Sequence, residues 1–560
     1  MNELFRRMIA KPGVTLELLI ASLVANVLAL ALPLFVIQVL NRYVAHGVEE
    51  TLATLSAGAV IAVVLEFGIR RERFRLARVV SIDADTKVAE TAFAMLTSAR
   101  ASVLERISPA RKAEIMSGID NVRSAYSSTN ICTVLDVPFA LLFIGVLYLL
   151  SPALSLVVTT FVVIAFLSGI LTQYSLRKPT REMIDETRAG NAYVGAAIQE
   201  AETVRAFNAA DAMRTAWIAQ IEKSTGQFRN IITRQGSLGL TTQSITGFMS
   251  IAVVSVGAIL VVLGDLNVGA LIGANILSSR SLQPISRFAQ LGEAFVKARY
   301  SESLLAEFSR MPAEQTQGSV KKNYTGRLEF RDLAFAHPGS SGPLFESLSL
   351  DIPPGSLVII NGDNGSGKST LARLLVGLIE PTRGQILVDG IDLRQINPQW
   401  WRQQVIFLPQ EPGFFNSTIE ANLKTLNPNM DATGLSKVVN ATGLRSYLDE
   451  SQQGLAAPVT EYGRHLSVGI RRRLALARAL TSNGKLAIMD EPTEGLDRKG
   501  FAAVINILES LKEHGCTIIA SSDNPAIVNK ADFIIDLNSK PKPAVRRVAR
   551  KATPIKVENA

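Results

Sequence analysis

The segment GDNGSGKS, residues 362–369, decides the fold of the C-terminal half of this 560-residue chain. It has the spacing G-x-x-x-x-G-K-S. An apolar run, SLVIIN (356–361), precedes it and has the composition of a buried strand, and a helical pattern follows from Thr370 to Ile379. A strand, a glycine-rich loop and a helix in this order are typical of a phosphate-binding loop. The segment therefore predicts an α/β nucleotide-binding domain.

Each residue type in this segment suits the binding of phosphate. Glycines let backbone N–H groups wrap around phosphate oxygens, and the N-terminus of the next helix adds a positive field. Lys368 would supply a point charge to the β- and γ-phosphates, and Ser369 would ligate Mg²⁺. We expect ATP and Mg²⁺ as ligands, with nucleotide contacts from Gly362, Asp363, Asn364, Gly365, Ser366, Gly367, Lys368, Ser369 and Thr370.

A second apolar run, Leu486–Met489, ends in the acidic pair Asp490-Glu491. An acid at the end of a buried strand can hold Mg²⁺, and the next acid can polarise an attacking water. Many strands end in acids, so the pair is weak alone. Its place about 120 residues after the phosphate loop strengthens the prediction.

Three further segments resemble the ATPase domain of ABC transporters: VIFLPQ ending at Gln410, LSVGIRRRLALAR (466–478) and EPTEGLD (491–497). The resemblance implies that Glu491 is the catalytic carboxylate and that Gln410 is both catalytic and a Mg²⁺ ligand. It implies that Asp490 joins Ser369 and Gln410 around the metal. The remaining nucleotide contacts implied by the resemblance are Ser467, Gly469, Asp497 and, at the place of an adenine-stacking aromatic, His337.

The chain departs from the family pattern at several positions. The signature usually reads LSGGQ, whereas Val468 and Ile470 replace a glycine and the glutamine here. Ile470 cannot donate a side-chain hydrogen bond, and Val468 adds bulk where backbone should approach closely. The segment 460–465, similar to the family's substrate-coupling loop, is about three residues short. The switch histidine is missing; its place falls on Asp523, or on Ser522 with a one-residue shift.

The N-terminal half carries six apolar runs, which predict six membrane spans. Short links join them in pairs, and polar stretches of about sixty residues separate the pairs. These stretches (70–130 and 174–240) hold 11 and 9 Lys and Arg, so the positive-inside rule puts them and both termini in the cytosol. Their helical apolar spacing predicts membrane helices that continue into the cytosol. The predicted spans are 18–40, 52–69, 131–150, 153–172, 245–263 and 268–291.

The charge balance supports a membrane protein. The net charge is +9, but residues 311–540 hold 23 Lys and Arg against 24 Asp and Glu. The surplus lies in residues 1–310 and in the last twenty residues. The basic tail lacks aromatic residues that would stack on bases. We therefore expect membrane lipid, and no nucleic acid, as a partner.

Two charges fall inside predicted spans: Asp136, one turn into span three, and Arg280, near the middle of span six. One interpretation is a snorkelling or internally paired structural charge. The other is a pair of groups that line a cavity, because charges that face lipid are costly.

In the membrane half, residues 32–44, 135–152 and 269–291 resemble permease/ATPase subunits of type I protein secretion systems. The resemblance implies a homodimeric exporter in a bacterial inner membrane. It would pass an unfolded polypeptide to a periplasmic adaptor and an outer-membrane channel. Only 17 residues precede span one, so we expect no N-terminal peptidase-like domain. The expected domains are a helical transmembrane domain (1–310), a linker (311–326), an ABC ATPase domain (327–538) and a disordered tail (539–560).

Two alternatives remain at this point. The altered signature and the missing histidine suit a subunit that binds ATP, hydrolyses it weakly and regulates or scaffolds a complex. The same architecture also serves exporters of lipids or small molecules.

Overall fold

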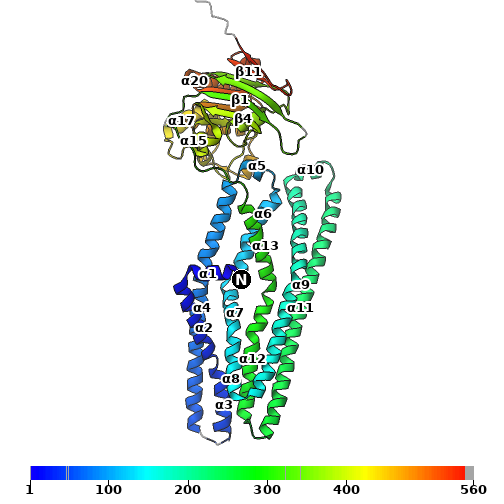
Figure 1. Ribbon diagram of the computed structural model, residues 1–560. Coiled ribbons are helices and arrows are strands. Elements are labelled where there is room, and N and C mark those ends of the chain that lie inside the picture. Colours follow the sequence, from blue (N-terminus) through cyan, green and yellow to red (C-terminus); the bar gives the residue numbers. More distant parts are fainter. Residues whose placement is uncertain (1, 46, 48, 322, 341, 549–560) are drawn as a thin grey trace, which may run out of the picture. The chain divides into compact units, whose positions relative to one another are not determined.

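The structure, a computed structural model, describes residues 2–45, 47, 49–321, 323–340 and 342–548 (Figure 1). The chain divides into two compact units. The first contains residues 1–98 and 105–311, and the second contains residues 99–104 and 312–560.

The first unit is helical. Its short links are set by local capping: the side-chain oxygen of Asn267 accepts a hydrogen bond from the N–H of Ala270 at 2.8 Å, and Pro152 follows the N-cap residue Ser151. Among its described residues the helices are α1 (Asn2–Ala10), α2 (Pro12–Leu28), α3 (Ala31–Gln38), α4 (Glu49–Ser98), α6 (Pro109–Ala125), α7 (Ser128–Asp136), α8 (Ala140–Leu150), α9 (Pro152–Gln199), α10 (Ala201–Ala206), α11 (Ala210–Val262), α12 (Val268–Gln290) and α13 (Gly292–Ser309), with a π-helical turn at Val39–Val44.

Three helices are much longer than a bilayer requires. Helices α4, α9 and α11 have 50, 48 and 53 residues, against about 20 for one crossing. The prediction that membrane helices continue as helices well beyond the spans is therefore confirmed. Five helical stretches of the described chain are long and apolar enough to cross a membrane. The sixth predicted span forms α12, which includes Arg280, Arg287 and several polar residues and is not among the five.

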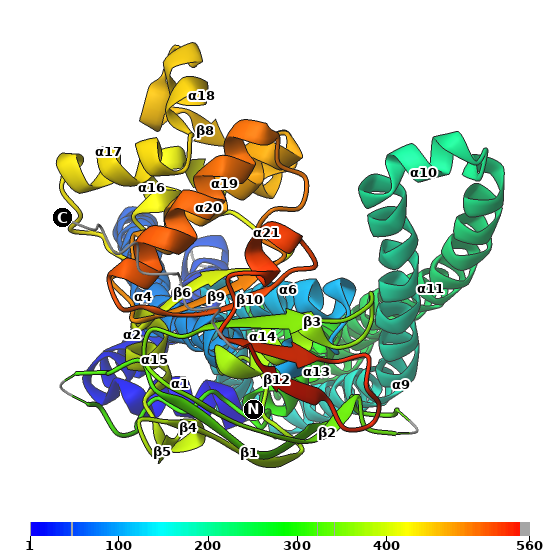
Figure 2. The ribbon, with the colours of Figure 1, turned by 90° about the horizontal axis from the view of Figure 1, so that it is seen from above.

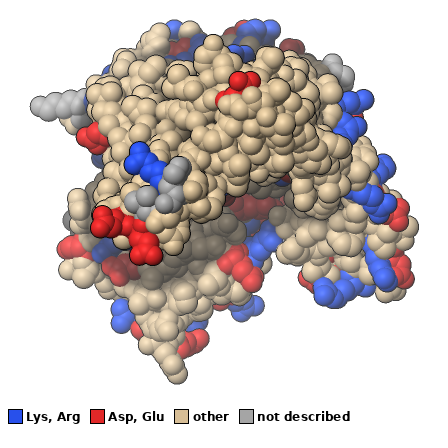
Figure 3. Space-filling view, turned by 90° about the horizontal axis from the view of Figure 1, so that it is seen from below, with Lys and Arg blue, Asp and Glu red and all other residues tan. Residues whose placement is uncertain are grey.

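Small residues let helices of this unit approach closely. A Cβ atom at Gly273 of α12 would lie 2.3 Å from Cγ1 of Ile37 in α3. Apolar side chains of α8, α9, α11 and α12 form one buried cluster that includes Leu147, Val158, Met249 and Leu277. Viewed from below, most of the near surface is uncharged, although a few acidic and basic groups lie within it (Figure 3). On the sides of the helices, large apolar residues such as Val63, Phe67 and Leu167 are exposed, as expected for segments that contact lipid.

The second unit is built on a six-stranded sheet in the order β12-β11-β3-β10-β9-β6 (Figure 2). All neighbours in it are parallel except the edge pair β11 and β12. A four-stranded antiparallel sheet has the order β2-β1-β4-β5, and β7 pairs with β8. The strands are β1 (Leu328–Phe335), β2 (Phe345–Ile352), β3 (Leu357–Asn361), β4 (Arg383–Val388), β5 (Ile391–Asp392), β6 (Val405–Leu408), β7 (Ser417–Thr418), β8 (Pro458–Val459), β9 (Leu486–Asp490), β10 (Thr517–Ser521), β11 (Phe533–Asp536) and β12 (Ala544–Arg547).

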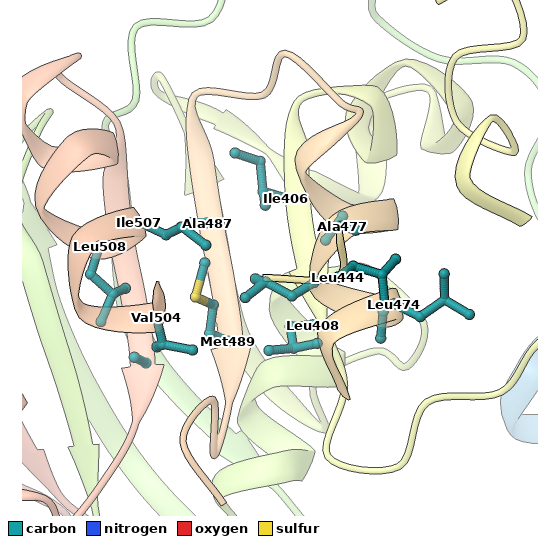
Figure 4. Close-up of a cluster of buried hydrophobic side chains, with 14 of the residues drawn as sticks. Ile406, Leu408, Leu444, Leu474, Ala477, Ala487, Met489, Val504, Ile507 and Leu508 are labelled. Atoms are coloured by element: carbon teal, nitrogen blue, oxygen red, sulfur yellow. The ribbon is translucent and has the colours of Figure 1, made fainter. Parts of the chain in front are cut away.

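The central strands are buried on both faces. In β9, Ala487 and Met489 join one hydrophobic cluster, whereas Leu486 and Ile488 join the cluster on the opposite face. Figure 4 shows the first cluster, with Met489 between Val504 and Leu408. This alternation follows from the two-residue period of a strand. It explains why these strands are continuous apolar runs in the sequence.

Helices cover this sheet. They are α14 (Lys368–Leu375), α15 (Pro398–Gln403), α16 (Ile419–Leu423), α17 (Ala432–Ala441), α18 (Arg445–Glu450), α19 (Val468–Leu480), α20 (Arg498–Glu513) and α21 (Pro525–Val528). The short helix α5 (Ala101–Leu104) also belongs to this unit. Just before it, Arg100 pairs with Glu380 at 2.9 Å.

One prediction was wrong within the tail. Residues 539–560 were expected to be disordered, but Ala544–Arg547 form β12 against β11. Backbone pairing of an edge strand explains the order, and the guanidinium of Arg547 lies 5.9 Å from the ring centroid of Phe533. Residues 549–560 lie outside the described chain.

Candidate functional site

The phosphate-loop segment connects β3 to α14. Gly367 has φ +114°, and a Cβ atom there would lie 2.8 Å from Cδ2 of Leu344, so only glycine fits this position. The N–H of Asp363 donates to Oδ1 of Asn538 at 2.8 Å, while Asn364 and Gly365 are exposed. Ser366 is buried, and its hydroxyl has no hydrogen-bond partner among the described residues. The loop is thus anchored at its ends.

The side chains of Lys368, Ser369, Gln410 and Glu491 contact one another in a chain. The ammonium of Lys368 lies 3.3 Å from Oε1 of Glu491 and donates to the carbonyl of Gly362 at 2.7 Å. Gln410 Nε2 donates to Oε2 of Glu491 at 3.2 Å, and Ser369 Oγ donates to Oε1 of Gln410 at 3.3 Å. The fold therefore brings together four side chains from three separate sequence segments.

The acidic pair at the end of β9 is fixed by β10. Ser521 Oγ donates to Oδ1 of Asp490 at 2.5 Å and accepts a hydrogen bond from the N–H of Glu491 at 2.8 Å. Glu491 has φ +49°, an uncommon conformation for a residue with a side chain. One serine thus holds both the buried Asp490 carboxylate and the turn that presents Glu491.

The environment lowers the pKa of Glu491. Burial acts to raise this pKa, but hydrogen bonds with Glu494 and Lys368 and the positive charge of Lys368 outweigh it. The carboxylate is therefore ionised at neutral pH. An ionised carboxylate beside the phosphate loop can accept a proton from water.

Sequence reasoning missed Arg472 and its partner Glu494. Arg472 is 7% exposed, donates to the carbonyl of Glu491 at 2.7 Å and to Oε2 of Glu494 at 2.6 Å. The sequence signal that could have pointed to Arg472 is the run of three consecutive arginines, 471–473, on a helix that packs on the core. One of these arginines, Arg472, is buried. Ser521 was also missed, because a serine at a strand end is common.

The signature segment forms the start of α19. Ser467 is the N-cap, and its hydroxyl accepts a hydrogen bond from the N–H of Ile470 at 3.3 Å. Ile470 is half-buried and packs against the hydrophobic cluster. Gly469 follows in the first turn, and a Cβ atom there would lie 3.7 Å from the carbonyl oxygen of Gly495. The N-terminus of α19 retains the field and the hydroxyl that suit an anion.

Asp497 lies across from this helix. It caps α20 by accepting from the N–H of Gly500 at 2.7 Å, and Arg473 also donates to it. Both hydrogen bonds lower the pKa of Asp497, and the one from the N–H of Gly500 has the larger effect. The segment 491–497 is therefore tied to α19 at both ends, through Arg472 and Arg473.

The remaining predicted positions differ in their exposure. His337 is exposed and contacts Phe335 edge to face, with ring centroids 5.0 Å apart. Asp523, at the place of the switch histidine, is exposed, whereas Ser522 is buried and its hydroxyl accepts from the N–H of Asn524 at 3.2 Å. Thr370 lies half-buried in the first turn of α14.

The oxygen donors expected for Mg²⁺ suit that ion. Ser369 Oγ and Gln410 Oε1 lie 3.3 Å apart, and Asp490 adds a buried carboxylate at the end of the neighbouring strand. Hydroxyl, amide and carboxylate oxygens are hard ligands that match Mg²⁺.

The two charges within the predicted spans line one small pocket of the first unit. Arg73 donates to both carboxylate oxygens of Asp136, at 2.5 and 3.0 Å, and Asn26 donates at 3.2 Å. Asp136 is therefore an internally paired charge. For Arg280, no ion pair or hydrogen bond is formed with the side chains that the structure describes.

Comparison with known proteins gives consistent matches for both units. Residues 345–494 match the family model described as "ABC transporter", and residues 15–284 match "ABC transporter transmembrane region". The leukotoxin translocation ATP-binding protein LktB of Mannheimia haemolytica is 28% identical over 523 residues, which cover 93% of this chain and 73% of the relative. LktB of Bibersteinia trehalosi has the same identity and coverage.

A solved structure described as a bacterial Atm1-family ABC exporter with ATP bound has the same fold. Its TM-score is 0.80 at 20% identity, over 96% of this chain and 94% of that chain.

Proposed function

The chain belongs to the ABC transporters and is an ATP-driven exporter subunit with several membrane helices, and we propose that its cargo is a polypeptide. The similarity to proteins named for leukotoxin translocation extends over 93% of the chain and supports this cargo class. The proposed role is the inner-membrane permease and ATPase of a type I protein secretion system.

We propose that two copies form the working transporter. In this arrangement the phosphate loop of one chain faces Ser467 and Gly469 of the other, so each ATP contacts both chains. Further partners would be a periplasmic adaptor and an outer-membrane channel. The basic stretches 70–130 and 174–240 support an orientation with both termini in the cytosol. We propose that residues 1–310 and 327–538 are the transmembrane and ATPase domains.

The proposed chemistry uses the contacts at the phosphate loop. Lys368 binds the β- and γ-phosphates, and Glu491 accepts a proton from the attacking water. Gln410, in contact with both Ser369 and Glu491, positions that water. Mg²⁺ would be held by Ser369, Gln410 and Asp490, and when bound it neutralises phosphate charge.

One observation carries the hydrolytic role: Glu491 contacts both Lys368 and Gln410 beside the phosphate loop. This contact favours an active ATPase over a weakly hydrolysing scaffold subunit, although Val468, Ile470 and Asp523 depart from the family pattern. The names of the relatives favour polypeptide over lipid or small molecules as cargo.

The test is ATP turnover by the purified full chain in lipid nanodiscs, beside a Glu491→Gln variant. We expect the variant to retain ATP binding and to lose about 100-fold or more in turnover. Equal background rates in both proteins would contradict an active homodimer. Cargo is tested in inverted vesicles: ATP-dependent uptake of an unfolded polypeptide, absent in the variant, supports the proposal, and uptake of lipid alone contradicts it.

A further inference from the structure

The turn that connects β11 to β12 contacts the phosphate-loop segment. Oδ1 of Asn538 accepts a hydrogen bond of 2.8 Å from the N–H of Asp363, the second residue of that segment. The ammonium of Lys540 donates a hydrogen bond of 2.8 Å to the carbonyl of Ser366. The motifs that identify the nucleotide site include neither Asn538 nor Lys540. Two side chains from a distant part of the chain therefore hold the backbone of the loop at two points.

The same turn joins the phosphate loop to the residues at the start of β2. Lys540 also donates to the carbonyl of Leu344, and Cδ2 of Leu344 would lie 2.8 Å from a Cβ atom at Gly367. The carbonyl of Pro541 accepts a hydrogen bond of 2.8 Å from the N–H of Glu346. The ammonium of Lys540 thus connects two segments that border Gly367.

The charge of Lys540 is not neutralised by an ion pair. Its hydrogen-bond partners are two backbone carbonyls, and no carboxylate pairs with it among the described residues. Part of its side chain is buried, which lowers the pKa of the ammonium. Lys368, in contrast, already lies 3.3 Å from the carboxylate of Glu491. Lys540 therefore adds a positive charge at the loop, and such a charge favours a bound anion.

The hydrogen bond to Ser366 polarises one peptide group of the loop. The carbonyl of Ser366 and the N–H of Gly367 belong to the same trans peptide, so they point in opposite directions. Gly367 is the N-cap residue of α14, and the N-terminus of this helix is where we expect phosphate. Because hydrogen bonds in a chain strengthen one another, an ammonium on the carbonyl makes this N–H a stronger donor.

We propose that Lys540 and Asn538 are positioning residues of the nucleotide site, which hold the phosphate loop in the conformation that binds phosphates. The inference rests on the proposed nucleotide binding at this loop. Both residues act through the loop backbone, at Ser366 and Asp363. Their contribution therefore belongs to the affinity for phosphate groups, whereas the rate of the chemical step depends on other side chains.

The experiment measures nucleotide binding to the full chain in lipid nanodiscs. The probes are trinitrophenyl derivatives of ADP and of adenosine, which differ only in the phosphates. We expect Lys540→Met to weaken binding of the ADP derivative about tenfold and to change binding of the adenosine derivative less than about twofold. Lys540→Arg keeps a cation with several donors and should retain most of the affinity. The matched control is Lys542→Met, which removes an exposed lysine of the same turn and should change neither affinity.

Steady-state turnover of the same variants gives a second test. In Lys540→Met the KM for ATP should rise about tenfold, while kcat should change less than about twofold, because the side chains around Glu491 stay in place. Asn538→Leu should show the same split with a rise in KM of about threefold, since its contact carries no charge.

Two results would overturn the positioning role. One is an unchanged affinity of Lys540→Met for the ADP derivative. The other is an equal loss of affinity for both derivatives, which a distorted domain would give. The proposed function fails separately: a wild-type chain that binds the ADP derivative but does not hydrolyse ATP contradicts only the ATPase.

Discussion

The guanidinium of Arg472 donates a hydrogen bond of 2.7 Å to the main-chain oxygen of Glu491. This bond joins the helix that carries the signature segment to the carboxylate at the end of β9. Because Arg472 also holds Glu494, two residues of the segment 491–497 move with α19. A displacement of the signature helix would therefore move Glu491 as well.

We predict that Arg472→Met lowers ATP turnover about tenfold with little change in ATP affinity, because Glu491 loses a positioning contact. The free energy of unfolding of the nucleotide unit should fall by about 1–3 kcal/mol, since the carbonyl of Glu491 loses a buried donor. Turnover, nucleotide binding and intrinsic tryptophan fluorescence, to which Trp400 and the buried Trp401 of this unit contribute, measure these effects.

The control for this variant is Arg445→Met, which breaks only an exposed pair with Asp449 and should have almost no effect. A double-mutant cycle with Glu494→Gln should give a coupling energy in stability. Purely additive effects of the two substitutions would contradict a direct interaction of Arg472 with Glu494.

The pH dependence of turnover should reflect the lowered pKa of Glu491. A carboxyl group whose folded pKa is below its ordinary value stays ionised above that value and loses its contribution only as the pH falls through the folded pKa. We therefore expect no loss of turnover from Glu491 between pH 8 and about 5.5. The measurement is ATP turnover across this range, with circular dichroism as a check that the protein stays folded. An acidic limb near pH 6 that vanishes in Glu491→Asp would speak against a lowered pKa.

Substitution of Asp523 by histidine should increase turnover severalfold. An ionised aspartate near the phosphate loop repels the γ-phosphate, whereas an imidazole can donate a hydrogen bond to it. Ser522→His is the matched comparison. Because Ser522 is buried and caps the N–H of Asn524, that variant should instead be destabilised. If Ser522→His raised turnover and Asp523→His did not, the histidine position would belong to Ser522.

Val468 and Gly495 should be energetically coupled. Gly495 has φ +68°, and a Cβ atom there would lie 2.9 Å from Cγ1 of Val468. Gly495→Ala should therefore cost about 1–2 kcal/mol from backbone strain, with an added cost from this contact. In a Val468→Gly background only the strain should remain. Thermal unfolding followed by tryptophan fluorescence tests this, and an identical cost in both backgrounds would show that the contact relaxes freely.

The sequence predicted those parts of the site in which the contacts follow from a local motif. The strand, loop and helix around Lys368 could be predicted because glycine spacing and a buried apolar run specify them jointly. Contacts between residues that are far apart in the chain could not be predicted. Asp136 was visible as a charge in a span, but its partner Arg73 lies 63 residues away on another helix. Arg472 was one of three consecutive arginines, and the sequence does not specify which of them is buried.

The tail and the sixth span show two further limits. Composition alone favoured disorder in residues 539–560, yet the free edge of β11 provides pairing for Ala544–Arg547. Arg280 and Arg287 lower the hydropathy of α12, so this helix is not among the five that are long and apolar enough to cross a membrane. A few charged residues can therefore weaken the pattern that would otherwise identify a membrane span.

The long helices α9 and α11 have a mechanical consequence. Hydrogen bonds join the two helices outside the predicted spans. The hydroxyls of Thr187 and Ser224 lie 3.0 Å apart, and Nε2 of Gln220 donates to the carbonyl of Glu186 at 3.0 Å. We therefore expect the two helices to move together as one rigid body. At 1.5 Å per residue α9 is about 72 Å long, so tilting it by about 3° shifts its far end by about 4 Å. A small change in the tilt of α9 therefore displaces its far end, and with it α11, by about 4 Å.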